Sequence, residues 1–131
     1  MSLVIAGRPD DPPLAAAWRA VQRAGIPGTF ADLSGDGVGM AAGRLTVDGR
    51  GVDDEALTGV YLRGHGARDP HLASAVRDWA DLAPPPVRVV NRRGPSATNT
   101  SKPAQALAIR EAGFEVPTGL LTTDPAGARA F

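Results

Sequence analysis

The sequence predicts an α/β fold in which an open, mostly parallel sheet carries helices on both faces. Short apolar runs alternate with longer amphipathic segments along the chain, which is the pattern of repeated strand–helix units. Each amphipathic segment begins at aspartate, serine or threonine with a proline close behind, and these residues favour the first turn of a helix. At 131 residues, the chain has the length of one such domain.

The first strand–helix unit occupies the amino terminus. Residues 2–7 form a short apolar run that ends in glycine, as a buried parallel strand does. Residues 10–25 are predicted to be a helix, because Asp10 or Asp11 can cap it and its apolar residues fall on one face. The glycine at position 25 ends this helix, and residues 28–34 are the second strand.

A small insertion follows the second strand. Residues 35–43 are glycine-rich and are predicted to be a flexible loop. Residues 44–52 are predicted to form a hairpin, because Asp48 and Gly49 supply the positive φ angles that a tight hairpin turn requires.

Two more strands and one helix complete the predicted sheet. Residues 59–64 and 87–91 are apolar runs that suit buried strands. Residues 69–83 between them are predicted to be a helix, with Asp69 as the cap and apolar residues on one stripe. Three consecutive prolines, at positions 84–86, end that helix.

The last third of the chain continues the alternation. A helix is predicted over residues 100–113, a strand over 116–123 and the start of another helix over 124–131. This last helix breaks off after about two turns without a C-cap signal. We therefore expect the chain to be the amino-terminal piece of a longer protein.

Composition excludes several classes of function. The formal net charge is zero, so no electrostatic footprint for nucleic acid is present. Cysteine is absent, which excludes disulfides and thiolate chemistry. No apolar run reaches the roughly 18 residues of a membrane-spanning helix. A cytoplasmic protein that binds neither nucleic acid nor membrane is expected.

Four charged residues are expected to meet at the carboxyl edge of the sheet. Arg8, Asp10 and Asp11 follow the first strand, and Arg63 ends a later one. In open α/β sheets this edge binds ligands, and arginine suits an anion such as a carboxylate. The alternative is that these residues only form helix caps and surface ion pairs.

Three further candidates lie around the third helix. Asn91 ends a strand, where a side-chain amide can hold the following loop. Ser101 is a candidate cap. Lys102, the only lysine among fourteen basic residues, lies in a first turn where the helix dipole disfavours cations. It either meets an anion or extends into solvent. A metal site made by His65, Asp69 and His71 is disfavoured, because two histidines and a capping aspartate make a poor ligand set.

Residues 87–131 resemble the junction segment of ATP-grasp ligases. The stretch "VVNRRGPSATNTSKPAQALAIREAGFEVPTGLLTTDPAGARAF" contains a strand that ends in Asn91, a lysine that opens a helix at Lys102, a glycine at Gly113 and the "VP" of Val116 and Pro117. It is most similar to RimK-like and microviridin-ligase-like members. Residues 1–86 fit the family's Rossmann-like pre-ATP-grasp domain less specifically.

The resemblance implies a division of labour. Residues 1–117 would be the pre-ATP-grasp domain, and 118–131 the start of an ATP-grasp domain that binds ATP and Mg²⁺. The present chain would bind no cofactor itself and would be inactive alone. Its partners would be the missing carboxy-terminal lobe and a small carboxylate or peptide substrate, and the surface meant for that lobe could also support a homodimer. Lys102 would lie at the interface or near the substrate, without binding phosphate.

One alternative function remains open. The chain could be a stand-alone binding or interaction module of Rossmann-like form that holds a small anion at its sheet edge through Arg8, Asp10 and Arg63.

Overall fold

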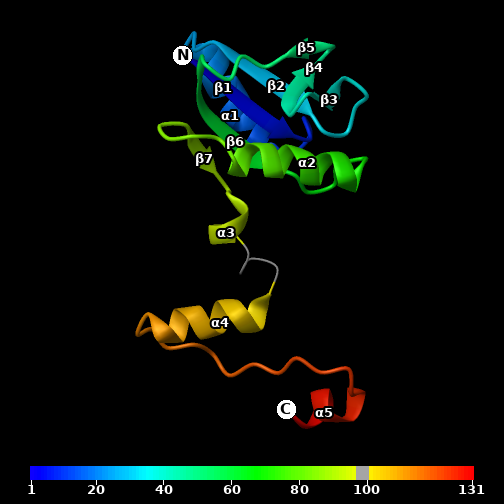
Figure 1. Cartoon of the computed structure of the whole chain (residues 1–131). Coiled ribbons are helices and arrows are strands. Elements are labelled where there is room, and N and C mark those ends of the chain that lie inside the picture. Colours follow the sequence, from blue (N-terminus) through cyan, green and yellow to red (C-terminus); the bar gives the residue numbers. More distant parts are fainter. Residues whose placement is uncertain (97–100) are drawn as a thin grey trace. The chain divides into compact units, whose positions relative to one another are not determined.

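The structure is a computed structural model that describes residues 1–96 and 101–131 (Figure 1). It divides into two compact units, Met1–Arg93 and Gly94–Phe131. The domain boundary that the sequence predicts after residue 117, and the assignment of 118–131 to an ATP-grasp domain, stay predictions.

The first unit is built on a four-stranded parallel sheet, as the sequence predicted. Its strand order is β2-β1-β6-β7. In the central row, Ile5 pairs with Phe30 on one side and with Tyr61 on the other. The strands are β1 (Ser2–Gly7), β2 (Gly28–Asp32), β6 (Leu57–Arg63) and β7 (Arg88–Val90).

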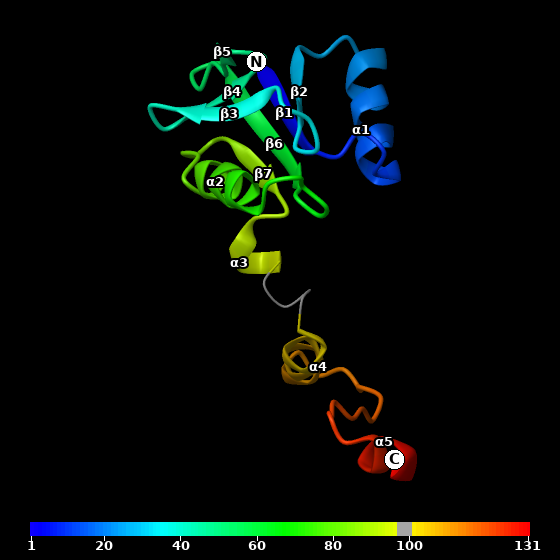
Figure 2. The ribbon, with the colours of Figure 1, turned by 90° about the vertical axis from the view of Figure 1, so that its right-hand side faces the viewer.

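Helices cover both faces of this sheet (Figure 2). Helix α1 (Pro12–Arg23) packs near β1 and β2, where the Trp18 ring lies 5.7 Å from that of Phe30. Helix α2 (Pro70–Asp81) covers the opposite face. Both begin at the predicted caps, because Asp11 accepts a hydrogen bond from the amide of Leu14 and Asp69 accepts one from the amide of His71.

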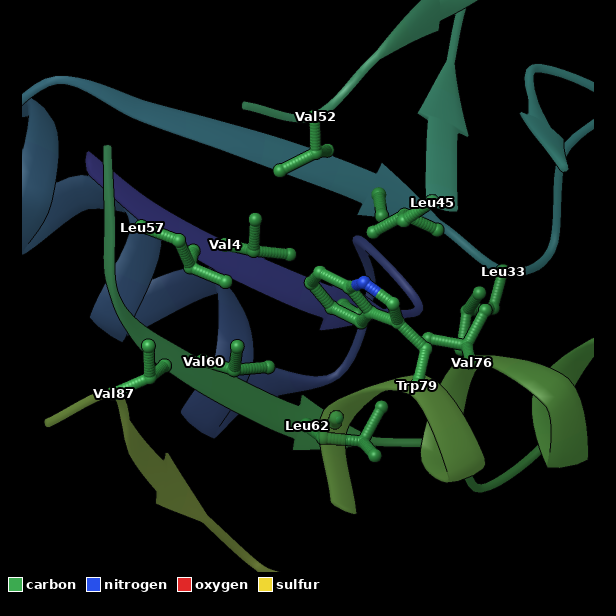
Figure 3. Packing of buried hydrophobic residues seen from close by; sticks show 13 residues of the cluster. Val4, Leu33, Leu45, Val52, Leu57, Val60, Leu62, Val76, Trp79 and Val87 are labelled. Carbon is green, nitrogen blue, oxygen red and sulfur yellow. The ribbon is translucent and has the colours of Figure 1, made fainter. Parts of the chain in front are cut away.

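The main core lies between the sheet and α2 (Figure 3). Trp79 and Val76 of α2 pack with Val4 of β1 and with Leu62 of β6. Because side chains alternate along a strand, Ile5 points to the other face, and it too is buried. The β1 strand is therefore apolar on both sides, which explains its continuous apolar run.

A second, antiparallel sheet is formed by the part of the chain that follows β2 and precedes β6 in the sequence. It consists of β3 (Val38–Ala41), β4 (Arg44–Val47) and β5 (Arg50–Gly51) in that order. The predicted turn is confirmed, with φ of 51° at Asp48 and 73° at Gly49. Fully buried Leu45 of β4 anchors this sheet to the main core.

One prediction about this insertion is wrong. Residues 35–43 were expected to be loop, but they contain β3, which pairs with β4 through a second tight turn. That turn uses Ala42 and Gly43, with φ of 50° and 77°. Alanine seldom adopts a positive φ, so the pair carries no usual hairpin signal.

The second unit has little core of its own. It contains α4 (Lys102–Glu111) and α5 (Pro125–Ala130), and neither helix has a buried residue. Ser101 and Asp124 cap them, each through a side-chain oxygen. A short helix, α3 (Arg93–Ser96), spans the boundary between the units.

The predicted strand over residues 116–123 is not observed. This segment pairs with no other strand in the part of the chain that the structure describes. Its two leucines remain accessible, with Leu120 49% and Leu121 82% exposed. An apolar run supplies the residues for a strand but not the neighbouring strand that it needs.

Across the described residues, no helix is long and apolar enough to cross a membrane.

We expect Gly7→Ala to destabilise the first unit. A Cβ at Gly7 would lie 2.4 Å from the carbonyl oxygen of Arg63 and 2.8 Å from Cδ2 of Leu14. Overpacking of this kind costs about 1–3 kcal/mol. Gly51→Ala is the control, because nothing lies within 4 Å of its added Cβ. Urea denaturation followed by tryptophan fluorescence measures both, and equal midpoints would contradict the close approach.

Candidate functional site

The carboxyl ends of β1 and β6 form the topological switch point of the sheet. These two strands are neighbours, but the chain leaves β1 toward α1 on one face and leaves β6 toward α2 on the other. The two following loops therefore separate here, as they do at ligand-binding crevices of open α/β sheets. Arg8, Asp10, Asp11 and Arg63 all come to this point, as the sequence predicted.

Arg63 is paired with Asp11 across the switch point. Its Nε lies 2.8 Å from Oδ2 of Asp11, and the two side chains are 32% and 16% exposed. The same carboxylate caps α1 through its other oxygen. The hydrogen bond from Arg63 is the main cause that lowers the pKa of Asp11, and it also raises the pKa of Arg63.

Arg8 is paired with Asp10 in the same loop. Its Nε donates to Oδ1 of Asp10 at 2.8 Å, and Nη2 bonds the other carboxylate oxygen. This hydrogen-bonded pair lowers the pKa of Asp10 and raises that of Arg8. Both predicted anion-binding arginines thus have an aspartate partner within the chain, which is the ion-pair alternative. A role for them in binding substrate stays a prediction.

Asn91 stabilises the adjacent end of the sheet. Its Nδ2 donates to the carbonyl oxygen of Leu62 at 3.0 Å, and its backbone has a φ of 68°. The amide was expected to hold the following loop, whereas the observed bond joins the end of β7 to β6.

Two glycines and one arginine at this edge were missed from the sequence. The β6–α2 loop contains Gly64, His65 and Gly66. A Cβ on Gly66 would lie 2.9 Å from Nη1 of Arg8, and one on Gly64 would lie 2.9 Å from Nη2 of Arg77. The loop is therefore flanked by two guanidinium groups. The closely spaced glycines of "RGHG" were the only sequence signal of this approach.

The other two predicted residues lie in the second unit. Ser101 caps α4, and Lys102 donates from Nζ to Oε1 of Gln105 at 3.1 Å. Lys102 also lines an open groove between α4 and the extended segment 114–121, together with Leu107, Arg110 and Leu120.

Metal ligands are not gathered within the described ranges, where no group of three or more histidine, cysteine or acidic residues could hold an ion. The carboxylate of Asp69 bonds the amides of His71 and Leu72 as a helix cap.

Comparison with known proteins gives matches among solved structures. The ATP-grasp ligase PsnB, in a complex with a variant minimal precursor, Mg and ADP, is 25% identical with a TM-score of 0.70, over 99% of this chain and 50% of its own. The macrocyclase MdnC from Microcystis aeruginosa MRC, bound to the precursor peptide MdnA, has a TM-score of 0.71 at 13% identity. No family model and no curated protein matches.

These neighbours confirm the resemblance to ATP-grasp ligases that residues 87–131 indicated. The chain spans about half the length of each, with 48% of MdnC and 50% of the related macrocyclase MdnB covered. The α/β fold with its small hairpin insertion agrees with that of a pre-ATP-grasp domain.

We expect the Arg63–Asp11 pair to make stability depend on pH. Because the pKa of Asp11 is lowered in the folded state, the pair stabilises the fold above the ordinary carboxyl pKa of about 3.9 and loses this effect as the pH falls through the lowered value. Asp11→Asn keeps a cap but removes the pair. Its deficit in thermal midpoint should be largest near neutrality and should shrink below about pH 4.

Asp69→Asn is the matched control, since Asp69 caps α2 and forms no ion pair with any described residue. If both variants showed the same pH dependence, the cap and not the ion pair would be responsible.

Proposed function

We propose that this chain, whose solved neighbours are ATP-grasp ligases, is the amino-terminal substrate-side and structural domain of an ATP-dependent carboxylate–amine ligase. The observation that carries the proposal is the similarity to PsnB along 99% of this chain but only 50% of that enzyme. A domain that matches half of a ligase supplies part of its machinery. We therefore expect the chain to be inactive alone. Its composition predicts that it acts in the cytoplasm.

The complete ligase would join a carboxylate to an amine in two steps. A substrate carboxylate oxygen attacks the γ-phosphorus of ATP, which forms an acyl phosphate and releases ADP. The amine then attacks the acyl carbon, the amide forms and phosphate leaves with the amine's proton going to solvent. Positive groups and Mg²⁺ offset the charge of the transferring phosphoryl group. We assign ATP and Mg²⁺ to the missing carboxy-terminal lobe, because this chain matches only half of a ligase that was solved with Mg and ADP.

A peptide is the proposed substrate. PsnB was solved with its precursor peptide PsnA2, and MdnC with MdnA. By analogy, the switch-point residues Arg8, Asp10, Asp11 and Arg63 are proposed to contact or position an acidic peptide, and Asn91 to hold the edge of the sheet beside them.

The second unit is proposed to provide the lobe interface. Its apolar side chains are unusually accessible, since Phe114 is 69% and Leu121 82% exposed. Contiguous apolar surface of this kind marks an interaction site. Ser101 and Lys102 belong to the same unit, with Lys102 at the edge of the groove. A homodimer that uses this surface is the competing arrangement.

We expect Leu121→Ser to weaken association with the ATP-binding lobe. The lobe encoded with this chain in its source genome would be added as a separate polypeptide, and its affinity measured by calorimetry. Burial of one leucine contributes about 1.5–3 kcal/mol, so the loss should be tenfold or more. Leu82→Ser is the matched control, because Leu82 is equally exposed, at 83%, in the first unit.

Activity provides the second readout. The mixture, but not the chain alone, should release ADP in response to an acidic peptide. ADP release by the chain alone, or no binding of the lobe, would contradict the proposal. A dimer in sedimentation that Leu121→Ser dissociates would instead assign the surface to self-association.

A further inference from the structure

Arg77 on helix α2 is a half-buried arginine without a partner. Three other arginines are similarly half-buried, and each donates to an oxygen: Arg8 to Asp10, Arg63 to Asp11, and Arg92 to the carbonyl oxygens of Asp81 and Ala83. Within residues 1–96 and 101–131, Arg77 alone among them has neither an ion pair nor a hydrogen bond. Partial burial of an unpaired cation is unfavourable, so this group calls for an anionic partner.

The carboxylates nearest in sequence and fold are already used. Asp81 lies one helical turn after Arg77, at the spacing that favours an ion pair, but it bonds Arg93 instead. Asp78 is also paired with Arg93, at 2.7 Å. On the facing loops, Asp10 and Asp11 hold Arg8 and Arg63. The remaining acidic groups nearby are bonded too: Asp32 to Ser34, Asp36 to Arg68 and Asp69 to the start of α2.

The position of Arg77 places its charge at the switch point. A Cβ on Gly64 would lie 2.9 Å from Nη2 and 3.2 Å from Nε of Arg77, so the guanidinium lies directly against the loop that follows β6. Arg8 lies against the other glycine of this loop, Gly66. The loop lies between two arginines, and its residues His65 and Gly66 are exposed. Of these two arginines, only Arg77 has no carboxylate partner among the described residues.

We propose that Arg77 and the Gly64–His65–Gly66 loop bind a carboxylate of the acidic peptide substrate. A guanidinium matches a carboxylate with two parallel hydrogen bonds. Arg77 adds one positive charge without a carboxylate partner among the described residues, while Asp32, whose carboxylate bonds the neutral Ser34, adds a negative charge near Arg8; this balance suits a singly charged carboxylate better than a doubly charged phosphate. The inference deepens the proposed function and rests on it for the biological role of the site.

Binding is tested on the chain alone. The blocked peptide acetyl-Gly-Glu-Gly-amide is titrated into the protein, and the amide resonances of Gly64, His65 and Gly66 are followed by NMR. We expect them to shift saturably, and Arg77→Gln to weaken the affinity at least fivefold. Arg88→Gln is the matched control, because Arg88 is an exposed arginine on β7, and its affinity should stay within twofold of the original. The peptide with glutamine in place of glutamate should not bind.

A second variant keeps the charge and moves it. Gly64→Ala places a methyl group where the Arg77 guanidinium now lies, so it should also weaken binding at least fivefold while the rest of the spectrum stays folded. It decides the outcome if Arg77→Gln does not fold.

Several results would overturn the assignment. Equal affinity in Arg77→Gln, or an equal loss in Arg88→Gln, would show that the charge acts non-specifically or not at all. If inorganic phosphate bound more tightly than the glutamate peptide, the ligand of this site would be a phosphate group and not a carboxylate. Because this titration needs no ATP-binding lobe, its failure is distinct from failure of the ligase proposal, which the ADP-release assay reports.

Discussion

The close approach of β1 and β6 at their carboxyl ends is the constraint on which the rest of the first unit depends. Gly7 is in register with Arg63, and its missing side chain leaves room for the Arg63 carbonyl and for Leu14 of α1. This contact brings the start of α1 close to the end of β6. The carboxylate of Asp11, which caps α1, therefore also reaches the Arg63 guanidinium. The pairing of β1 with β6, the packing of α1 and the Asp11–Arg63 ion pair therefore all depend on the same few residues around Gly7.

The candidate site could be predicted in its location but not in its pairing. The order of strands and helices sends the loops after β1 and β6 to one edge, and this follows from the sequence pattern alone. Which aspartate pairs with which arginine depends on the loop conformation. From the sequence, Arg8 and Arg63 could therefore either bind an anionic ligand or form ion pairs within the chain. Arg77 could not be found at all, because its partial burial results from the way α2 lies across the sheet.

Local signals predicted the fold best. Aspartate before proline correctly predicted the starts of α1 and α2. The capping side chain bonds backbone amides of the first turn of its own helix, so the signal needs no distant partner. Prediction failed where structure depends on distant partners or on rare backbone geometry. Segment 116–123 is apolar but has no neighbouring strand among the described residues, and β3 was hidden because the turn at Ala42 uses a conformation that alanine rarely adopts.

The insertion of β3–β5 between β2 and β6 has a consequence for the order of folding. Strand β1 lies at the centre of the sheet, but one of its two neighbours, β6, is reached only after residues 8–56. Pairing across so long an interval must first overcome the entropy of closing that loop. During synthesis, β1, α1 and β2 emerge well before β6 and α2, so the face of β1 that carries Val4 and packs against α2 is not fully covered until residue 81 has been added. Until then, the nascent chain would consist of a β–α–β unit in which one apolar face of β1 stays exposed to solvent.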